Sequence, residues 1–177
     1  VAVTTQAGGR PVLTFDTDGG TVEQAVDRVV FALPFTLLRR LDLTEAGLSD
    51  GKQAIIRTLG YGTNAKLMMR FGSRPWRDPG MAAGGIFADA AGLMNRSVSD
   101  IGDLQATWET SRGYGGADGI LTNFVGGTRG IAIGGGSAEE RAAEVLPWLN
   151  GVFPGTMAAY TAGSAVRQHW PTAPYAL

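Results

Sequence analysis

Short apolar runs separated by glycine-rich turns dominate the sequence, and this pattern is typical of strands rather than long helices. At the start of the chain, residues 1–6 and 10–16 are β-prone runs separated by Ala7-Gly8-Gly9, and Asp18-Gly19-Gly20 precedes a further run, 21–25. Turns of this composition join antiparallel neighbours. We therefore predict a β-hairpin or β-meander over the first 25 residues.

The apolar run Val29–Leu33 contains no polar residue, and an unbroken run of this kind predicts a strand that is buried on both faces. Pro34 ends the run, and proline is favoured in the first turn of a helix. We therefore predict a short helix over residues 35–41. If Val30 lies in a buried strand, the Val30→Asp substitution would bury an unpaired charge and abolish folding.

A helix followed by a strand is predicted in the middle of the chain. Ser49 or Asp50 can cap a helix that runs through residues 53–59, with Gly60 in the left-handed conformation that often ends a helix. Residues 66–71 then form an apolar run between two loops that contain glycine. A run with these borders predicts a buried strand.

Three more strands are predicted in the C-terminal part. Residues 104–111 and 119–127 are expected to pair around the glycine-rich loop 113–119. Residues 158–170 are expected to form the last strand.

A longer helix is predicted between these strands. Ser137 and Glu140 have the spacing of a capping box, in which each side chain bonds the other residue's backbone N–H, and Pro154 prevents the helix from continuing. Its buried face is predicted to carry Ala142, Val145, Leu146 and Leu149. Together the elements predict an α+β fold, a mixed or largely antiparallel sheet flanked by helices, in a single domain over residues 1–177.

The composition is that of an ordinary soluble protein and excludes several classes of function. Of the 177 residues, 44% are hydrophobic and 18% are charged, and the formal net charge is -1. We therefore expect no nucleic acid partner and no membrane partner. The absence of cysteine excludes disulfides, thiolate catalysis and zinc–cysteine sites. The cytoplasm is the expected location, although the sequence carries no signal for a compartment.

Other familiar sites are not predicted. The segments 113–119 and 130–137 are rich in glycine but lack the spacing of a dinucleotide fingerprint or a phosphate loop, and no serine has the setting of a hydrolase nucleophile. His169 is the only histidine, so we expect a hydrogen-bonded structural role and no metal site. Glu109 and Asp118 are expected to be solvated charges rather than an acid–base pair.

Lys66 and the tryptophans are the remaining candidates for a functional site. Lys66 is one of two lysines, against thirteen arginines, and its ammonium needs water, a carboxylate or a ligand at the start of an apolar strand. The alternative is a lysine that extends from the strand end into solvent. Trp108 and Trp170 are candidates for ligand contact, because flat aromatic side chains orient ligands, whereas Trp76 and Trp148 are assigned to packing.

Four blocks of the sequence, in order, resemble the flavin-containing amine oxidases, the group of monoamine, polyamine and L-amino-acid oxidases. One block is an aromatic-Gly-x-x-x-Lys strand closed by Pro-Trp, which spans Tyr61–Trp76 here. Another is an Asp-x-Val-Val-x-Ala-x-Pro crossover. The blocks in chain order are Asp27–Pro34, Tyr61–Trp76, the strand pair 104–111 with 119–127, and Trp170–Tyr175.

The resemblance implies a reaction and a set of site residues. In that family the lysine holds a water molecule against flavin N5, so a catalytic role is implied for Lys66, with substrate contact for Trp108. Contact with FAD is implied for Trp170, Val1, Ala32, Pro34 and Tyr175. The implied reaction oxidises a C–N bond: hydride passes to the flavin, the imine hydrolyses, and oxygen reoxidises the flavin with release of hydrogen peroxide.

The family's pyrophosphate-binding segment has no counterpart in this sequence. We therefore expect the substrate-binding part of a longer flavoenzyme, inactive by itself. Its expected partners are a small amine or amino-acid substrate and the flavin-binding remainder of the protein, with a second copy of the chain as a further option. Two alternatives stay open, a non-catalytic binding module of the same fold without flavin and a dehydrogenase that uses another electron acceptor.

Overall fold

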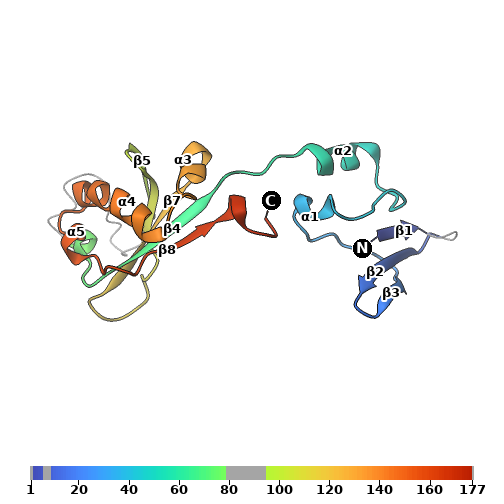
Figure 1. Cartoon of the computed structure of the whole chain (residues 1–177), viewed down its shortest axis with the longest axis horizontal. Helices are drawn as coiled ribbons and strands as arrows, with labels where there is room; N and C mark the ends of the chain where they lie inside the picture. Colours follow the sequence, from blue (N-terminus) through green and yellow to red (C-terminus); the bar gives the residue numbers. More distant parts are fainter. Residues whose placement is uncertain (1, 6–8, 79–94, 177) are drawn as a thin grey trace. The chain divides into compact units, whose positions relative to one another are not determined.

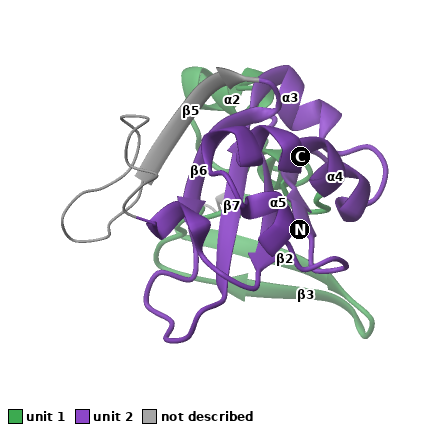
Figure 2. Cartoon of the chain, turned by 90° about the vertical axis from the view of Figure 1, so that its left-hand side faces the viewer, with its two compact units in different colours: residues 1–61, 173–177 green, residues 62–172 purple. Residues whose placement is uncertain are grey.

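The computed structural model describes residues 2–5, 9–78 and 95–176. The chain forms two compact units (Figure 2): unit 1 comprises residues 1–61 and 173–177, and unit 2 comprises residues 62–172. Every pairing between the described strands is antiparallel, and helices accompany the strands in both units, so the predicted α+β class is confirmed. None of the described helices has the length and apolar character that crossing a bilayer requires.

Unit 1 begins with a three-stranded meander (Figure 1). Strands β1 (Ala2–Thr5), β2 (Pro11–Thr17) and β3 (Gly20–Ala25) lie in the order β1-β2-β3. Gly20 adopts a positive φ of 107° at the β2–β3 turn, a conformation that glycine reaches without steric cost. The meander predicted from the turn residues is therefore confirmed.

Two helices follow in unit 1, and both were predicted. Helix α1 (Phe35–Leu38) starts directly after Pro34, and α2 (Asp50–Thr58) is capped by Ser49, whose Oγ accepts a bond from the Lys52 backbone N–H at 3.3 Å. The predicted end of α2 agrees with the structure to within one residue, but the left-handed conformation expected at Gly60 is not found. The C-cap of α2 is Leu59 in an extended conformation, and Gly60 does not have a positive φ.

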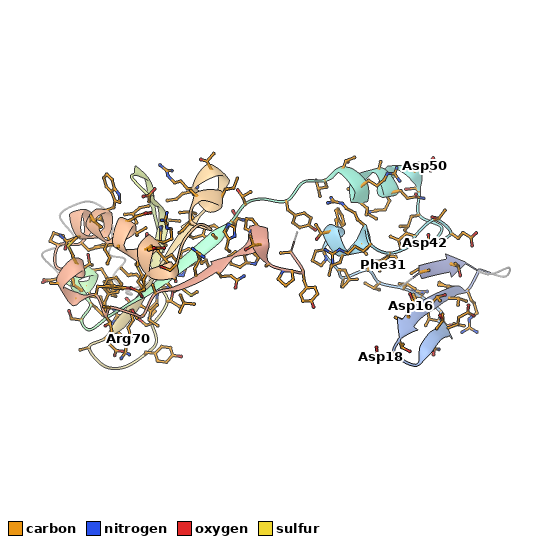
Figure 3. The ribbon with its side chains drawn as sticks, in the orientation of Figure 1. Asp16, Asp18, Phe31, Asp42, Asp50 and Arg70 are labelled. Atoms are coloured by element: carbon orange, nitrogen blue, oxygen red, sulfur yellow. The ribbon has the colours of Figure 1, made fainter. Side chains whose placement is uncertain are left out.

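The predicted buried strand Val29–Leu33 is also wrong. These residues are irregular between β3 and α1, where Phe31 is labelled in Figure 3, and 88% of Val30 is exposed. An apolar run can form a buried strand only where a neighbouring strand offers hydrogen bonds, and no described strand pairs with this run. In this structure a charge at Val30 would meet water, so the expected folding defect of Val30→Asp has no basis.

Unit 2 is built on a five-stranded sheet with the order β5-β6-β7-β4-β8. The predicted pairing of the two strands around the glycine-rich loop is confirmed by the register of β6 with β7, in which Trp108 lies opposite Thr122. The strand bounds are β4 Ala65–Phe71, β5 Asn95–Ile101, β6 Leu104–Glu109, β7 Gly119–Val125 and β8 Val166–His169.

In the part of unit 2 that the structure describes, three α-helices and two short 3-10 turns accompany the sheet. The capping box of α4 is confirmed, since Ser137 Oγ accepts from the Glu140 N–H at 3.1 Å and Glu140 Oε2 accepts from the Ser137 N–H at 2.7 Å. Helix α4 tolerates Pro147 in its interior and ends at Val152. The bounds are η1 Pro75–Arg77, α3 Gly127–Ala132, α4 Ala138–Val152, α5 Thr156–Ala159 and η3 Trp170–Thr172.

The core of unit 2 lies between α4 and one face of the sheet (Figure 1). Four alternate residues of β4 are completely buried: Ala65, Leu67, Met69 and Phe71. They share one hydrophobic cluster with the predicted inner face of α4, Ala142, Val145, Leu146 and Leu149. Since side chains alternate across a strand, the residues between them, including Lys66, point to the opposite face.

The last predicted strand is shorter than expected. Of residues 158–170, only Val166–His169 forms a strand, because α5 continues to Ala159 and a turn with Gly163 at φ 79° follows. Before this turn the segment meets β4 at an isolated bridge between Tyr160 and Phe71, where the Thr161 N–H donates to the Arg70 carbonyl at 2.9 Å. The turn glycine was a local signal that the strand interpretation overlooked.

The buried face of α4 leads to a stability prediction. Leu149 is completely buried, so we expect Leu149→Ala to leave a cavity and lower the free energy of unfolding by about 2–5 kcal/mol. Met157, which is 49% exposed, provides the control, and Met157→Ala should change the free energy of unfolding by less than about 0.5 kcal/mol. Urea unfolding followed by circular dichroism measures both values, and equal losses would contradict the assignment of the core.

Candidate functional site

Lys66 is the second residue of β4, the strand between β7 and β8. Its register partners are Phe124 on β7 and Gln168 on β8. In an antiparallel sheet, side chains of paired residues lie on the same face. Lys66 therefore belongs to the face that does not pack on α4, which we call the open face of the sheet.

The ammonium of Lys66 lies between two tryptophan rings. Its Nζ is 5.6 Å from the ring centroid of Trp108 and 5.4 Å from that of Trp170. Both distances are within the range of cation–π attraction, which reaches to about 6 Å. The structure thus brings together Lys66, Trp108 and Trp170, three residues that the sequence singled out separately, and we call them the Lys66 cluster.

The apolar side chains of Met68 and Phe124 lie on the open face together with the Lys66 cluster. Met68 follows Lys66 at the next position of this face, and the Phe124 ring lies 5.8 Å from the Trp108 ring at an angle of 44°. All these side chains are half-buried rather than fully exposed. The arrangement can place a single positive charge beside a flat apolar surface, which suits a ligand with an apolar body and one polar group.

Trp170 reaches the cluster because β8 pairs with the beginning of β4. His169 lies opposite Ala65, and the Trp170 N–H donates to the Asn64 carbonyl at 3.3 Å. The predicted hydrogen bonding of His169 is confirmed, since its Nε2 is 3.0 Å from the Gly130 carbonyl oxygen and its Nδ1 is 2.9 Å from Thr172 Oγ1. Within the described ranges, no group of three or more His, Asp or Glu side chains could hold a metal ion.

A close contact between α3 and the chain entering β4 was not predicted. A Cβ added to Gly130 would lie 1.7 Å from the Thr63 carbonyl oxygen, so only glycine allows this approach. Thr63 Oγ1 also donates to the Gly127 carbonyl at 2.7 Å. The signal in the sequence is the spacing of Gly126, Gly127 and Gly130, because small residues at such positions let backbones meet. We call this contact the α3 junction.

Glu109 occupies the opposite end of the sheet and corrects the prediction of a solvated charge. Only 3% of the residue is exposed, and its carboxylate accepts bonds from Trp76 Nε1 at 3.0 Å and from Arg77 Nε and Nη2 at 2.8 and 2.7 Å. Arg74 Nε lies 3.4 Å away. These partners lie more than 30 positions away along the chain, so the spacing of charges could not indicate them.

Burial would raise the pKa of the Glu109 carboxyl, but the hydrogen bonds from Arg77 and Trp76 and the two guanidinium charges outweigh it and leave the pKa below its usual range. Asp118, in contrast, keeps 48% of its side chain exposed and pairs with Arg70 at 3.0 Å, as expected for a solvated charge (Arg70 is labelled in Figure 3). Glu109 therefore fixes the segment after β4, which carries Arg74, Trp76 and Arg77, to the sheet.

The two tryptophans assigned to packing differ in exposure. Trp76 is 2% exposed and packs edge-on against Phe71 with 5.2 Å between the ring centroids, so its packing role is confirmed. Trp148 is 44% exposed, and its ring covers Gly102, where a Cβ would come within 2.1 Å of it. Gly102 has a φ of 52°, a conformation that favours glycine, and the Trp148 ring also leaves no space for a Cβ at this position.

With this geometry in place, comparison with known proteins decides the family. A family model described as flavin containing amine oxidoreductase matches residues 1–177. The chain belongs to this family. The resemblance drawn from the four sequence blocks is thereby confirmed. No curated protein matches the chain by sequence.

Solved structures of amine oxidases share the fold of this family member. Wild-type putrescine oxidase bound to putrescine has 19% identity and a TM-score of 0.65, over 98% of this chain and 34% of that chain. Cyclohexylamine oxidase from Brevibacterium oxydans IH-35A has 15% identity and a TM-score of 0.69, over 99% of this chain and 34% of that chain. The chain thus spans about a third of the length of the solved structures that it matches.

The family uses a flavin, and the Lys66 cluster fits the flat ring end of such a cofactor better than its phosphate end. Two aromatic rings and a cation are available there. At the N-terminus of α4, where the glycine-rich segment 130–137 ends, the capping box already occupies the backbone N–H groups of Ser137 and Glu140. A pyrophosphate would find those donors taken.

The other residues predicted to contact FAD belong to unit 1. Ala32 and Pro34 lie just before α1, and Tyr175 is 72% exposed near the C-terminal end. Val1 lies outside the described residues. The predicted cofactor contacts are therefore divided between the units, with Trp170 in unit 2.

Glu109 provides a test of the charge arrangement in this amine oxidase family member. Its lowered folded-state pKa means that its contribution to stability is present above the ordinary glutamate range, near 4.3, and is lost as the pH falls through the folded value. Glu109→Gln should therefore lower the free energy of unfolding at pH 7, by on the order of 3 kcal/mol, and flatten its decline below pH ~4.

Glu144→Gln is the matched control, because Glu144 is 49% exposed in its pair with Arg141. Glu144→Gln should change the free energy of unfolding by less than about 0.5 kcal/mol, both at pH 7 and below pH ~4. Chemical denaturation at a series of pH values measures both variants. A Glu109→Gln curve parallel to that of the parent would show that Glu109 does not carry this pH dependence.

Proposed function

We propose that the chain is the substrate-binding part of an FAD-dependent amine or L-amino-acid oxidase. In this proposal the enzyme oxidises a C–N bond to an imine and reduces oxygen to hydrogen peroxide. The observation that carries the proposal is the Lys66 ammonium between Trp108 and Trp170 on the open face. Membership of the family of flavin containing amine oxidoreductases supports it.

When bound, FAD supplies the hydride acceptor, and the protein supplies position and electrostatics. Lys66 contributes a cation whose place is restricted by two rings at 5.4 and 5.6 Å. An ammonium has three N–H donors and no acceptor, so it can hold and orient a water molecule at the site. A cation that is positioned in advance needs no reorganisation when charge develops during the reaction.

The open face also favours a particular form of the substrate. Trp108, Phe124 and Met68 provide apolar area for the body of an amine. A second positive charge about 4 Å from the Lys66 ammonium would cost about 1 kcal/mol in water and about 4 kcal/mol at a partly buried site. The site therefore selects the neutral amine over the ammonium form, and the neutral amine is the form with a free electron pair on nitrogen.

A non-catalytic module of the same fold is the second candidate. It is favoured by one observation: the donors at the N-terminus of α4 are occupied by the capping box and leave no place for a pyrophosphate there. If this candidate is correct, preparations of the protein with its native flanking sequence would contain no flavin. An absorbance spectrum of that protein separates the two candidates.

FAD binding tests the proposed division of labour. We expect the 177-residue chain not to bind FAD tightly, because the proposal assigns the pyrophosphate site to another part of the enzyme. Titration of the chain with FAD, followed by tryptophan fluorescence or calorimetry, should give a Kd weaker than about 1 μM, the affinity that corresponds to about 8 kcal/mol. Binding at or below that value would contradict this division.

Lys66→Met tests the role of the ammonium in the complete flavoenzyme. Methionine keeps the apolar stem and removes the charge, so folding and flavin content should survive while turnover falls tenfold or more, about 1.4 kcal/mol of barrier. Lys52→Met is the matched control, because Lys52 is exposed on α2 and is the other lysine of the chain. Stopped-flow rates of the reductive and oxidative half-reactions that equal the parent's would remove Lys66 from the mechanism.

A further inference from the structure

The imidazole of His169 joins the end of β8 to α3. Its Nε2 is 3.0 Å from the Gly130 carbonyl oxygen, which can only accept, so Nε2 carries a proton and donates it. In the neutral ring Nδ1 then accepts from the Thr172 hydroxyl at 2.9 Å. Both ring nitrogens therefore have partners, one on α3 and one on the turn η3 that follows the strand.

Backbone atoms fix the ring and its acceptor in place. A Cβ built on Gly134 would lie 2.5 Å from Cε1 and Nε2 of His169, so the ring packs directly on the Gly134 backbone. The acceptor Gly130 is itself pressed against Thr63 in the α3 junction. In the observed position the imidazole therefore contacts both α3 and the loop after it.

Trp170 directly follows His169, at the end of the short strand β8. Strand β8 has four residues and lies at the edge of the sheet, where pairing on one side only makes fraying easy. The Trp170 backbone makes one hydrogen bond to Asn64, at 3.3 Å, which is long for an N–H to carbonyl bond. Yet its ring lies 5.4 Å from the Lys66 ammonium.

We infer that His169 is a positioning residue, which holds Trp170 against Lys66 by tying the end of β8 to the α3 junction. The effect on turnover rests on the proposed function, whereas the effect on the Trp170 ring does not. The Thr172 hydroxyl can also donate to the His169 carbonyl, at 3.4 Å, when Nδ1 carries a proton. The tie is therefore satisfied in both protonation states of the ring.

The first test disturbs the packing of the imidazole and leaves His169 itself in the sequence. The chain contains four tryptophans, so fluorine NMR of protein labelled with 5-fluorotryptophan should give four resonances, assigned with single Trp→Phe variants. Lys66→Met identifies the resonances that sense the ammonium, which should be those of Trp108 and Trp170. Gly134→Ala places a methyl group too close to the imidazole of His169, and we expect this variant to shift the Trp170 resonance.

Gly135→Ala is the matched control. The nearest atom to a Cβ at Gly135 is the Ala132 carbonyl oxygen, at 3.6 Å, an ordinary contact, and Gly135 does not have a positive φ. This variant should leave all four resonances in place. If Gly134→Ala and Gly135→Ala give the same Trp170 resonance as the parent, the packing of His169 does not position Trp170 and the inference is overturned.

The second test changes the side chain of His169. Glutamine can place an amide donor near the position of Nε2 and keep the bond to Gly130, whereas alanine cannot. We expect His169→Ala to shift the Trp170 resonance and reduce its response to Lys66→Met, and His169→Gln to restore both. If folded His169→Ala keeps the parent's resonance and response, His169 is not a positioning residue. Should His169→Ala fail to fold, the comparison of Gly134→Ala with His169→Gln decides in its place.

The same variants in the complete flavoenzyme separate this inference from the proposed function. Displacing a site residue by about 1 Å can cost up to about a hundredfold in rate, so His169→Ala should lower kcat, and His169→Gln should recover most of it. Shifted Trp170 resonances with unchanged kcat would support the positioning role and contradict the proposed function. Unshifted resonances contradict the positioning role whatever the activity.

Discussion

The alternation of side chains along β4 is the constraint on which the rest of unit 2 depends. The residues at odd positions, from Ala65 to Phe71, are completely buried and fill the space under α4. The same backbone therefore must present Lys66 on the other face. Burial of one face fixes the register of the strand, and the position of the ammonium follows from hydrophobic packing on the far side of the sheet.

The two ends of β4 are secured by different physical means. At the end near Lys66, the contact between α3 and the Thr63 backbone is possible because Gly130 has no side chain. At the other end the contact depends on charge, with the buried Glu109 carboxylate bonded to Arg77 and Trp76.

Local signals predicted much of this fold. The capping box at Ser137 and Glu140, the meander and β4 itself were all legible, because each depends on residues a few positions apart. The run Val29–Leu33 was misjudged, since burial of a strand depends on a partner that the run does not specify. The partners of Glu109 also come from distant positions and left no local trace. Lys66, Trp108 and Trp170 were singled out by residue type and by resemblance to a family, whereas their spacing along the chain did not show that they meet.

The short edge strand β8 has a consequence for the identity of the residue that faces the ammonium. Because successive side chains of a strand alternate, sliding β8 along β4 by one residue would exchange the faces of all its side chains and carry Trp170 with them. Four residues of pairing offer little resistance to such slippage. The ring of His169 contacts the Gly134 backbone and the Gly130 carbonyl in the observed register, so a shift by one residue would break both contacts. The imidazole therefore stabilises the register in which Trp170 faces the ammonium.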